Sequence, residues 1–430
     1  MIISKGILKR MAWYVLYFWG LVLVYCLWVS PNYKYAGYVF RFSLECFIFA
    51  LIASVIVAYF TAGQFSTSKV CDNIIGLISI LYFFPQMVLC AFCLNDIRYF
   101  CFVMLYWALL VFWNKYLPIK TTKIVVKERK LLFEIIIVGL SLMMVAISGL
   151  FSGFRISFDL SEYYEYRFQI REVAMPSILR YVLNWARTLL PLGMIYAMIT
   201  KRKWMAVVMV VSQILCFSFD GKKSALFMMF LTIVVFYFYK DRFRDKMPLY
   251  VFGMSIFTLI ESALRSGASF VGKHIIRRML FVPSYLGWAY FDYFQTHTYD
   301  YLRGSILRWF GLKSIYTESI PRIIGSLYTT SSVSGVNANT GLCGDAFSNF
   351  GWISLAIYPL LDLVIFRIIG KYSDEFDYRV KIIISLIVAY TFLSGSFFTL
   401  LLTNGILLMI ILTIVMPKNV NQSEVSIALK

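Results

Sequence analysis

Charged side chains are scarce in this sequence. Of its 430 residues only 15% are Asp, Glu, Lys or Arg, whereas 60% are hydrophobic and 18% are aromatic. A soluble globular chain is closer to half apolar and about a quarter charged. The composition therefore excludes a soluble domain and favours a chain that lies largely in lipid.

The hydrophobic runs also lack the alternation of polar and apolar residues that is typical of the strands of a membrane barrel. They are long enough for a helix to cross a hydrocarbon core, which takes roughly 20 residues. The sequence predicts an all-α polytopic membrane protein, with residues 1–430 forming a single integral membrane domain. The twelve predicted spans cover residues 12–29, 38–61, 74–94, 98–117, 132–151, 176–200, 203–219, 224–240, 249–264, 346–368, 380–395 and 398–416.

Motifs for metals, phosphate loops and disulfides are missing as well. Seven of the eight cysteines lie in or beside predicted spans, and only Cys343 is predicted to lie outside the membrane. An exterior disulfide within one chain is therefore not expected. No His, Cys and carboxylate residues have metal-ligand spacing, and there is no Gly-rich phosphate loop. We predict no metal and no cofactor.

Lys and Arg predict the orientation, because short cytoplasmic loops are enriched in them. They gather before the first span, near Lys69, in residues 115–130, in residues 240–246 and around Arg379. All these segments fall on one side, which places both termini in the cytoplasm. Much of the formal charge of +19 is thus a signal of topology and of contact with membrane lipid, not of nucleic-acid binding.

Two longer segments are then predicted outside, at residues 152–175 and 265–345. The second is a long loop with interfacial helices, and it holds eight basic and four acidic residues. Long loops escape the positive-inside bias, so the excess is either tolerated or marks a site for an anionic substrate such as a phosphate ester.

The sixth predicted span carries an arginine ladder. Arg180, Asn184 and Arg187 stand at i, i+4 and i+7, on one helix face that descends about 10 Å at 1.5 Å per residue. Charges at this depth are expensive unless they face water or a partner. We expect the ladder to face a wet cavity, with Arg171 at its mouth, although Arg180 by itself fits contact with outer headgroups.

Three other segments carry candidate residues. Lys223 lies at the start of the eighth span, where helix N-terminal amides would hold an anion or a lipid headgroup. Arg277 and Arg278 precede an aromatic stretch over residues 285–294, which suits either the membrane interface or a glycan groove. His297 is an acid/base candidate in the same loop, although isolated histidines are commonly surface residues.

The segment over residues 337–351 is polar and rich in glycine. Asn337 and Asn339 offer amides of the kind that bind sugar hydroxyls, while Asp345 and Asn349 share a helix face at i and i+4. Capping would explain a single aspartate at this position but not the whole polar cluster.

Taken together, these segments resemble the Wzy-type oligosaccharide repeat-unit polymerases that build O-antigens and capsules. The resemblance covers roughly residues 160 to 370, and residues 337–351 are its most specific part. It rests on Tyr166-Arg167, Arg171-Glu172, Arg180-Tyr181, Asn184-Trp185, Pro191, residues 220–224, Arg278, Pro283, residues 290–294 and residues 337–351. An Arg-x10-Gly pattern found in outer loops of some such polymerases is missing here.

The resemblance implies a metal-independent glycosyltransferase of the bacterial inner membrane. It would polymerise undecaprenyl-diphosphate-linked repeat units at the periplasmic face. The product would be either the O-antigen of lipopolysaccharide or the polysaccharide of a capsule. A Wzz-like chain-length regulator and a flippase would be partners. A flippase of the same lipid-linked unit and an O-antigen ligase remain alternatives.

The roles expected of the candidate residues follow from this chemistry. The predicted diphosphate-binding residues are Arg171, Arg180, Arg187, Lys223, Arg277 and Arg278. Asp345, His297 and Arg187 are the predicted catalytic residues, and Asn337, Asn339 and Asn349 the predicted sugar-binding ones.

Overall fold

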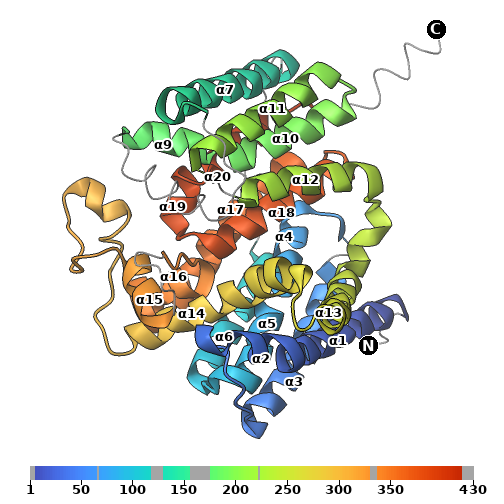
Figure 1. The fold of residues 1–430 in the computed structure, drawn as a ribbon, viewed down its shortest axis with the longest axis vertical. Helices are drawn as coiled ribbons and strands as arrows, with labels where there is room; N and C mark the ends of the chain where they lie inside the picture. The colour runs from blue at the N-terminus through green and yellow to red at the C-terminus, as the bar shows by residue number, and fades with distance from the viewer. Residues whose placement is uncertain are drawn as a thin grey trace. The chain divides into compact units, whose positions relative to one another are not determined.

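The computed structural model describes residues 5–64, 67–117, 129–154, 175–220, 223–329 and 337–418. Within these ranges the regular elements are all helices, which confirms the all-α prediction (Figure 1). The chain divides into two compact units. Unit 1 comprises residues 1–119, 242–366 and 389–398, and unit 2 comprises residues 120–241, 367–388 and 399–430.

Unit 1 is built around the N-terminal helices. Helix α1 packs against α3 and α13, and α14 packs against α16, α5 and α15 (Figure 1). The elements of this unit are α1 (Lys5–Val24), η1 (Tyr25–Val29), α2 (Ser30–Tyr33), η2 (Lys34–Ala36), α3 (Leu44–Gln64), α4 (Val70–Ile78), η4 (Ser79–Phe83), α5 (Phe84–Leu89), η5 (Cys90–Leu94), α6 (Ile97–Tyr116), α13 (Met247–Leu264), η7 (Gly272–Phe281), α14 (Val282–Phe294), η8 (Ile306–Phe310), α15 (Ile320–Tyr328), α16 (Leu342–Phe350) and η9 (Gly351–Ile353).

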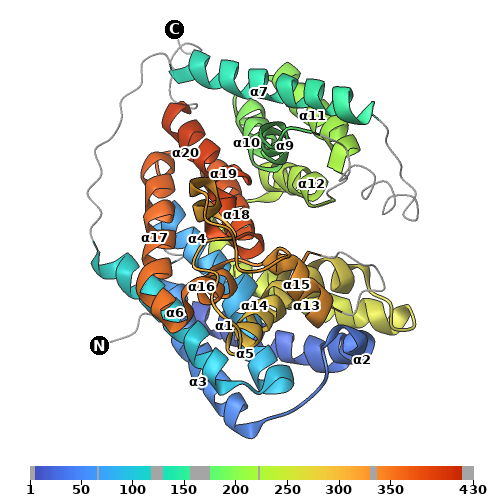
Figure 2. The ribbon, with the colours of Figure 1, turned by 90° about the vertical axis from the view of Figure 1, so that its left-hand side faces the viewer.

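Unit 2 centres on α10, which contacts α7, α11, α12 and α20 (Figure 2). Its own helices are α7 (Arg129–Ser152), α9 (Ser177–Asn184), α10 (Ala186–Ile199), α11 (Lys203–Asp220), α12 (Lys223–Phe238) and α20 (Ile406–Val415). The boundaries between the units fall near η6 (Asp241–Lys246) and within α17 (Ser354–Ser373), α18 (Tyr378–Ser394) and α19 (Phe397–Leu402).

Nine helices in the described part of the chain are long and apolar enough to cross a membrane. They cover Lys5–Ala36, Leu44–Gly63, Val70–Leu94, Ile97–Tyr116, Arg129–Ser152, Ser177–Ile199, Asp241–Leu264, Leu342–Ser373 and Phe397–Val415. The predicted spans at 203–219, 224–240 and 380–395 coincide with shorter helices, α11, α12 and α18. The multi-pass helical character is thus supported, and the count of twelve stays a prediction.

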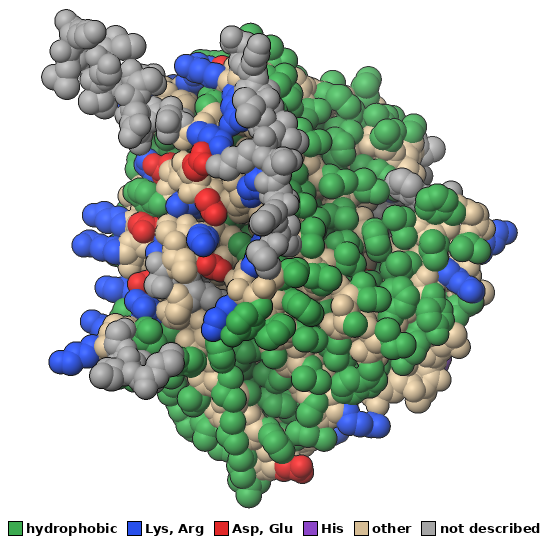
Figure 3. Space-filling model, turned by 180° about the vertical axis from the view of Figure 1, so that it is seen from behind, with side chains coloured by type: hydrophobic (Ala, Val, Ile, Leu, Met, Phe, Trp, Pro, Cys, Tyr) green, Lys and Arg blue, Asp and Glu red, His purple; other side chains and the backbone are tan. Residues whose placement is uncertain are grey.

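Large apolar side chains are exposed on the surface of the spanning helices, and α3 is an example. On α3, large side chains such as Leu44 and Ile52 are more than half exposed, and Ile48, Val55 and Phe60 lie on the same helix with similar exposure. Figure 3 shows a face of the molecule that is largely hydrophobic. Such a surface would be unfavourable in water, since contiguous exposed apolar area marks contact with another apolar phase.

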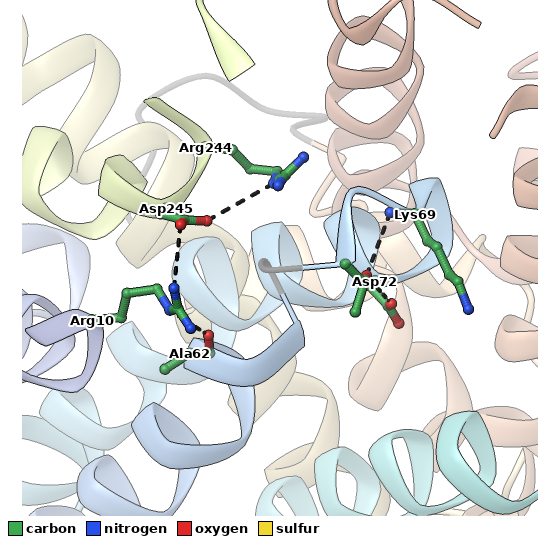
Figure 4. A network of polar contacts seen from close by, with 7 residues as sticks. Arg10, Ala62, Lys69, Asp72, Arg244 and Asp245 are labelled. Carbon is green, nitrogen blue, oxygen red and sulfur yellow. Dashed lines mark hydrogen bonds and ion pairs between the residues drawn. The ribbon is translucent and has the colours of Figure 1, made fainter. Parts of the chain in front are cut away.

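Segments predicted to lie on the cytoplasmic side contact one another within unit 1. Arg10 near the start of α1 donates from Nε to the Ala62 carbonyl (2.9 Å) and pairs through Nη1 with Asp245 (3.4 Å) (Figure 4). At the same end, Asn114 near the end of the fourth predicted span donates to Asp72 (2.8 Å). These contacts join three connections that the Lys and Arg pattern placed on one side, and they add the inner end of the fourth span.

Segments predicted to lie outside also meet one another in unit 1. The Trp28 indole at the end of the first span donates to the Gly267 carbonyl (2.9 Å). The Trp288 indole donates to Asp96 (3.4 Å), which precedes the fourth span. Unit 2 shows a contact on the predicted inner side, where Arg202 after the sixth span pairs with Glu134 at the start of the fifth.

The long segment after α13 carries the aromatic stretch that suits either the membrane interface or a glycan groove. In the structure Tyr285, Tyr290, Phe291, Tyr293 and Phe294 of α14 are buried inside unit 1. The Ser284 hydroxyl donates to the Tyr82 carbonyl (3.1 Å), so α14 packs against the third spanning helix rather than lying on a surface.

Thiol labelling tests the sidedness. Cys343 is fully buried and unsuitable as a probe. Lys69 and Lys273 are exposed on the predicted inner and outer sides. We expect Lys273→Cys to react with a membrane-impermeant maleimide in cells with an opened outer membrane, and Lys69→Cys to react only after the inner membrane is permeabilised. The reverse pattern would invert the orientation.

Candidate functional site

Arg277 on η7 is a cation that rests on aromatic rings. Its Cζ lies 4.3 Å from the Tyr33 ring centroid and 6.0 Å from that of Tyr38. Its Nε is buried without a hydrogen-bond acceptor. Among the described residues no carboxylate pairs with this guanidinium, so it keeps its charge available for an anion.

Local sequence explains why Arg277 is placed there. In η7 the side chains of Ile276, Leu280 and Phe281 are buried, whereas Lys273 and Arg278 are exposed. The element is therefore amphipathic, and Arg277 lies at the edge between its buried and exposed faces. The next residue, Arg278, is exposed. It is also predicted to bind the diphosphate.

An aromatic row extends from Arg277 along α14. We use this name for Tyr33, Tyr38, Tyr285, Trp288 and Tyr328. Consecutive ring centroids lie 5.1 Å apart for Tyr38 and Tyr285, 5.5 Å for Tyr285 and Trp288, and 5.9 Å for Trp288 and Tyr328. These are ordinary contact distances for aromatic pairs, so the rings hold one another in place.

Gly37 allows Tyr285 of the aromatic row to pack closely against the backbone of the connection after the first span. Gly37, with φ of +87°, has no Cβ, and the Tyr285 hydroxyl fills the space that a Cβ would take. Any larger residue would clash with that hydroxyl and be strained at this φ. The connection after the first span and helix α14 are thereby held together.

Two carboxylates border the row. Asp96 is the N-cap of α6, where Oδ1 accepts from the Tyr99 amide (3.1 Å) and Oδ2 from the Trp288 indole (3.4 Å). Asp292 accepts from the Tyr328 hydroxyl through Oδ2 (2.6 Å). In the part of the chain that the structure describes, Oδ1 of Asp292 has no hydrogen-bond partner.

The hydroxyls of the row stay protonated at neutral pH. Burial raises the pKa of Tyr285 to about 12. Burial, and then the hydrogen bond to Asp292, raise the pKa of Tyr328 well above its usual value. Tyr328 therefore remains a donor to Asp292, which fixes the direction of that carboxylate.

The polar segment at 337–351 is joined to α14 and α15. The Tyr290 hydroxyl donates to the Ala338 carbonyl (2.9 Å), and the Ala338 amide donates to the Pro321 carbonyl (2.8 Å). Asn337 and Asn339 on either side of Ala338 are exposed. Their amides are thus open to a ligand, as a sugar-binding role requires.

Asp345 is buried, with 7% of its side chain exposed. Its Oδ2 accepts from the Phe397 amide (2.7 Å), and its Oδ1 accepts from Asn349 Nδ2 (3.1 Å). Asn349 Oδ1 in turn accepts from the Leu302 amide (2.8 Å). Both oxygens of the predicted base are occupied, which supports a role in holding α16 to its neighbours.

His297, the other acid/base candidate, is exposed. Its ring stacks on that of Tyr293 at 3.8 Å and 10°, and its Nδ1 lies 2.8 Å from the Tyr293 carbonyl oxygen. Thr296 Oγ1 lies 3.0 Å from the same nitrogen. These contacts leave Nε2 as the nitrogen for any proton transfer.

The arginine ladder belongs to unit 2. Arg180 and Asn184 lie on α9 and Arg187 on α10, with Trp185 between the two helices. All three are half-buried, and Nε and Nη2 of Arg187 are out of contact with solvent. The Trp185 indole donates to the Leu402 carbonyl (2.7 Å), so the helix junction packs where α19 ends.

The side chains of two predicted residues lie outside the described parts. Arg171 falls in residues 155–174, and Lys223 begins α12 with a side chain that is not described. Their predicted role in binding the diphosphate stays a prediction.

Sequence reasoning did not single out Asp362. It lies on α17, is 2% exposed and accepts a hydrogen bond from the Tyr106 hydroxyl. The available signal was a lone acidic residue inside a predicted span, at 346–368, because such residues are costly in lipid and usually functional.

Among the described residues, no three or more His, Cys, Asp or Glu side chains are grouped so as to hold a metal ion. Comparisons with protein-family models, with curated proteins and with solved structures find no match to this chain.

Proposed function

We propose that the protein is a membrane glycosyltransferase that polymerises undecaprenyl-diphosphate-linked oligosaccharide repeat units. The observation that carries the proposal is Arg277, a guanidinium without a carboxylate partner at the head of the aromatic row. A planar guanidinium binds phosphate oxygens in bidentate fashion. Aromatic rings bordered by carboxylates suit the sugars next to such a diphosphate.

The reaction transfers a growing chain from its carrier. The bond between the anomeric carbon and the diphosphate oxygen breaks, and the acceptor hydroxyl oxygen forms the new bond to that carbon. The hydroxyl proton passes to a base, and undecaprenyl diphosphate leaves with the bonding electron pair. Arg277 would stabilise the charge that develops on the leaving oxygen, which is where electrostatic catalysis acts most strongly.

The other predicted residues extend this proposal. Arg180 and Arg187 are proposed to bind phosphate in unit 2, and Asn337 and Asn339 to bind sugar hydroxyls. The proposed location is the bacterial inner membrane with both termini in the cytoplasm and the chemistry at the periplasmic face. A chain-length regulator would act on the same growing polymer.

A flippase of the same lipid-linked unit is the second candidate, and Asp362 favours it. Buried carboxylates within spans occur in ion and proton pathways of transporters. A transporter built from repeats would also place such charges in corresponding positions of two halves. The sequence contains no such repeat, so polymerisation remains the better-supported function.

The surface polysaccharide of a strain lacking the protein separates these functions. For a polymerase we expect the ladder of long chains to disappear from a polysaccharide gel while a single repeat unit remains attached. Loss of the single unit as well would indicate the flippase or a ligase. An unchanged ladder would refute the proposed function.

A further inference from the structure

We infer that Trp288, Asp96 and Asp292 form a sugar-binding subsite along the aromatic row from Arg277, selective for neutral or amino sugars. The inference rests on the proposed function for its ligand, a lipid-linked oligosaccharide. The sequence left the stretch that contains Trp288 and Asp292 open between the membrane interface and a glycan groove, and it did not assign Asp96 to a site. All three belong to unit 1.

The Trp288 ring is held as a fixed platform. It is half-buried between Tyr285 at 5.5 Å and Tyr328, whose ring stands perpendicular to it at 5.9 Å. Its indole N–H is directed to Asp96 Oδ2. A rigid aromatic face offers a large contact area at a low cost in conformational entropy.

The two carboxylates supply the polar contacts. Asp292 has one oxygen bound by Tyr328 and the other without a partner among the described residues. Asp96 has its Oδ2 held only by the long 3.4 Å contact from Trp288. Sugar hydroxyls are donors, and their hydrogen bonds to carboxylates are charge-assisted.

Charge sets the selectivity. No described Lys or Arg pairs with Asp96 or Asp292, so the subsite keeps its negative character. A uronic acid or another acidic sugar would be repelled there, whereas neutral and amino sugars would not. Arg277 carries the opposite charge at the other end of the row, where the diphosphate is proposed to bind.

Spacing links the two ends. Tyr38 is near both Arg277 and Tyr285, and each step along Tyr38, Tyr285 and Trp288 is between 5 and 6 Å. Tyr38 and Tyr285 are themselves buried, so they fix the separation between Arg277 and Trp288, and Trp288 is the half-buried ring that the sugars attached to a diphosphate at Arg277 would contact. One bound molecule would contact both the arginine and the carboxylates.

The test measures binding of free glycan to the purified full-length protein in detergent. The probe is the oligosaccharide that mild acid releases from the lipid-linked intermediates of the host strain. We expect Trp288→Ala and Asp292→Asn each to weaken binding roughly tenfold or more. Asp292→Asn keeps an acceptor for Tyr328, so it changes charge with little effect on folding.

Trp19→Ala is the matched control, because Trp19 is 42% exposed on α1 of the same unit and lies outside the row. We expect its Kd to equal that of the wild type. Unchanged binding in both row variants, or an equal loss in the Trp19 variant, would overturn the subsite. Oxidising the probe's primary hydroxyls to carboxylates should also weaken binding to the wild type, and equal affinity would overturn the selectivity.

The polysaccharide gel of the strain lacking the protein distinguishes a failure of the subsite from a failure of the proposed function. If the row variants lose glycan binding but the strain lacking the protein keeps a full ladder, the subsite stands and polymerisation fails. If the ladder is lost in that strain but the row variants bind glycan normally, the function stands and the subsite fails.

Discussion

Arg277→Ala is expected to lower the rate of polymer formation roughly 10²- to 10³-fold, the scale seen when one group that stabilises transition-state charge is removed. The guanidinium rests over Tyr33 and Tyr38 with no described carboxylate partner, so the variant loses the charge offered to the diphosphate. The measurement is the initial rate with purified lipid-linked repeat unit, normalised to folded protein.

Two further variants sharpen the result. Arg277→Lys keeps the charge but loses the planar fork, so its rate should fall between wild type and Arg277→Ala. Lys273→Gln removes one positive charge from an exposed position of the same element and should leave the rate unchanged. A similar loss in the Lys273 variant would attribute the effect to net charge rather than to the site.

Asp345→Ala is expected to destabilise unit 1 by roughly 1–3 kcal/mol, because it leaves the Phe397 amide buried without an acceptor. Asn349 Nδ2 loses one acceptor but keeps the Asp345 carbonyl oxygen and the Tyr358 hydroxyl. Thermal unfolding of the detergent-solubilised protein gives the shift in Tm. Asp345→Asn retains one acceptor oxygen but turns an NH₂ group toward Asn349 Nδ2, so a smaller loss is expected.

A swapped pair separates the positioning role from the predicted catalytic role. In Asp345→Asn combined with Asn349→Asp, the amide at 345 can donate to the carboxylate at 349, which still accepts from the Leu302 amide. Stability and polymer formation should both recover if Asp345 positions α16. Recovered stability with a rate still lowered about 10²-fold would assign Asp345 as the base.

The sequence by itself determined the helical membrane character of the protein. Its apolar runs must be helices because backbone amides in lipid have to pair internally, and helices do this within one segment. The distribution of Lys and Arg also grouped connections that the structure brings together, such as those containing Arg10 and Asp245. Both signals are local, so they can be recognised without knowledge of distant contacts.

Only the tertiary structure decided which candidates meet. Arg277 was one of six predicted diphosphate-binding residues until the structure placed it on Tyr33 and Tyr38, which lie more than 200 positions earlier in the chain. Asp292 and Asp345 look alike in sequence, yet one keeps an oxygen without a partner and the other has both oxygens occupied. Such differences depend on which donors reach a carboxylate from other helices, and no local spacing records that.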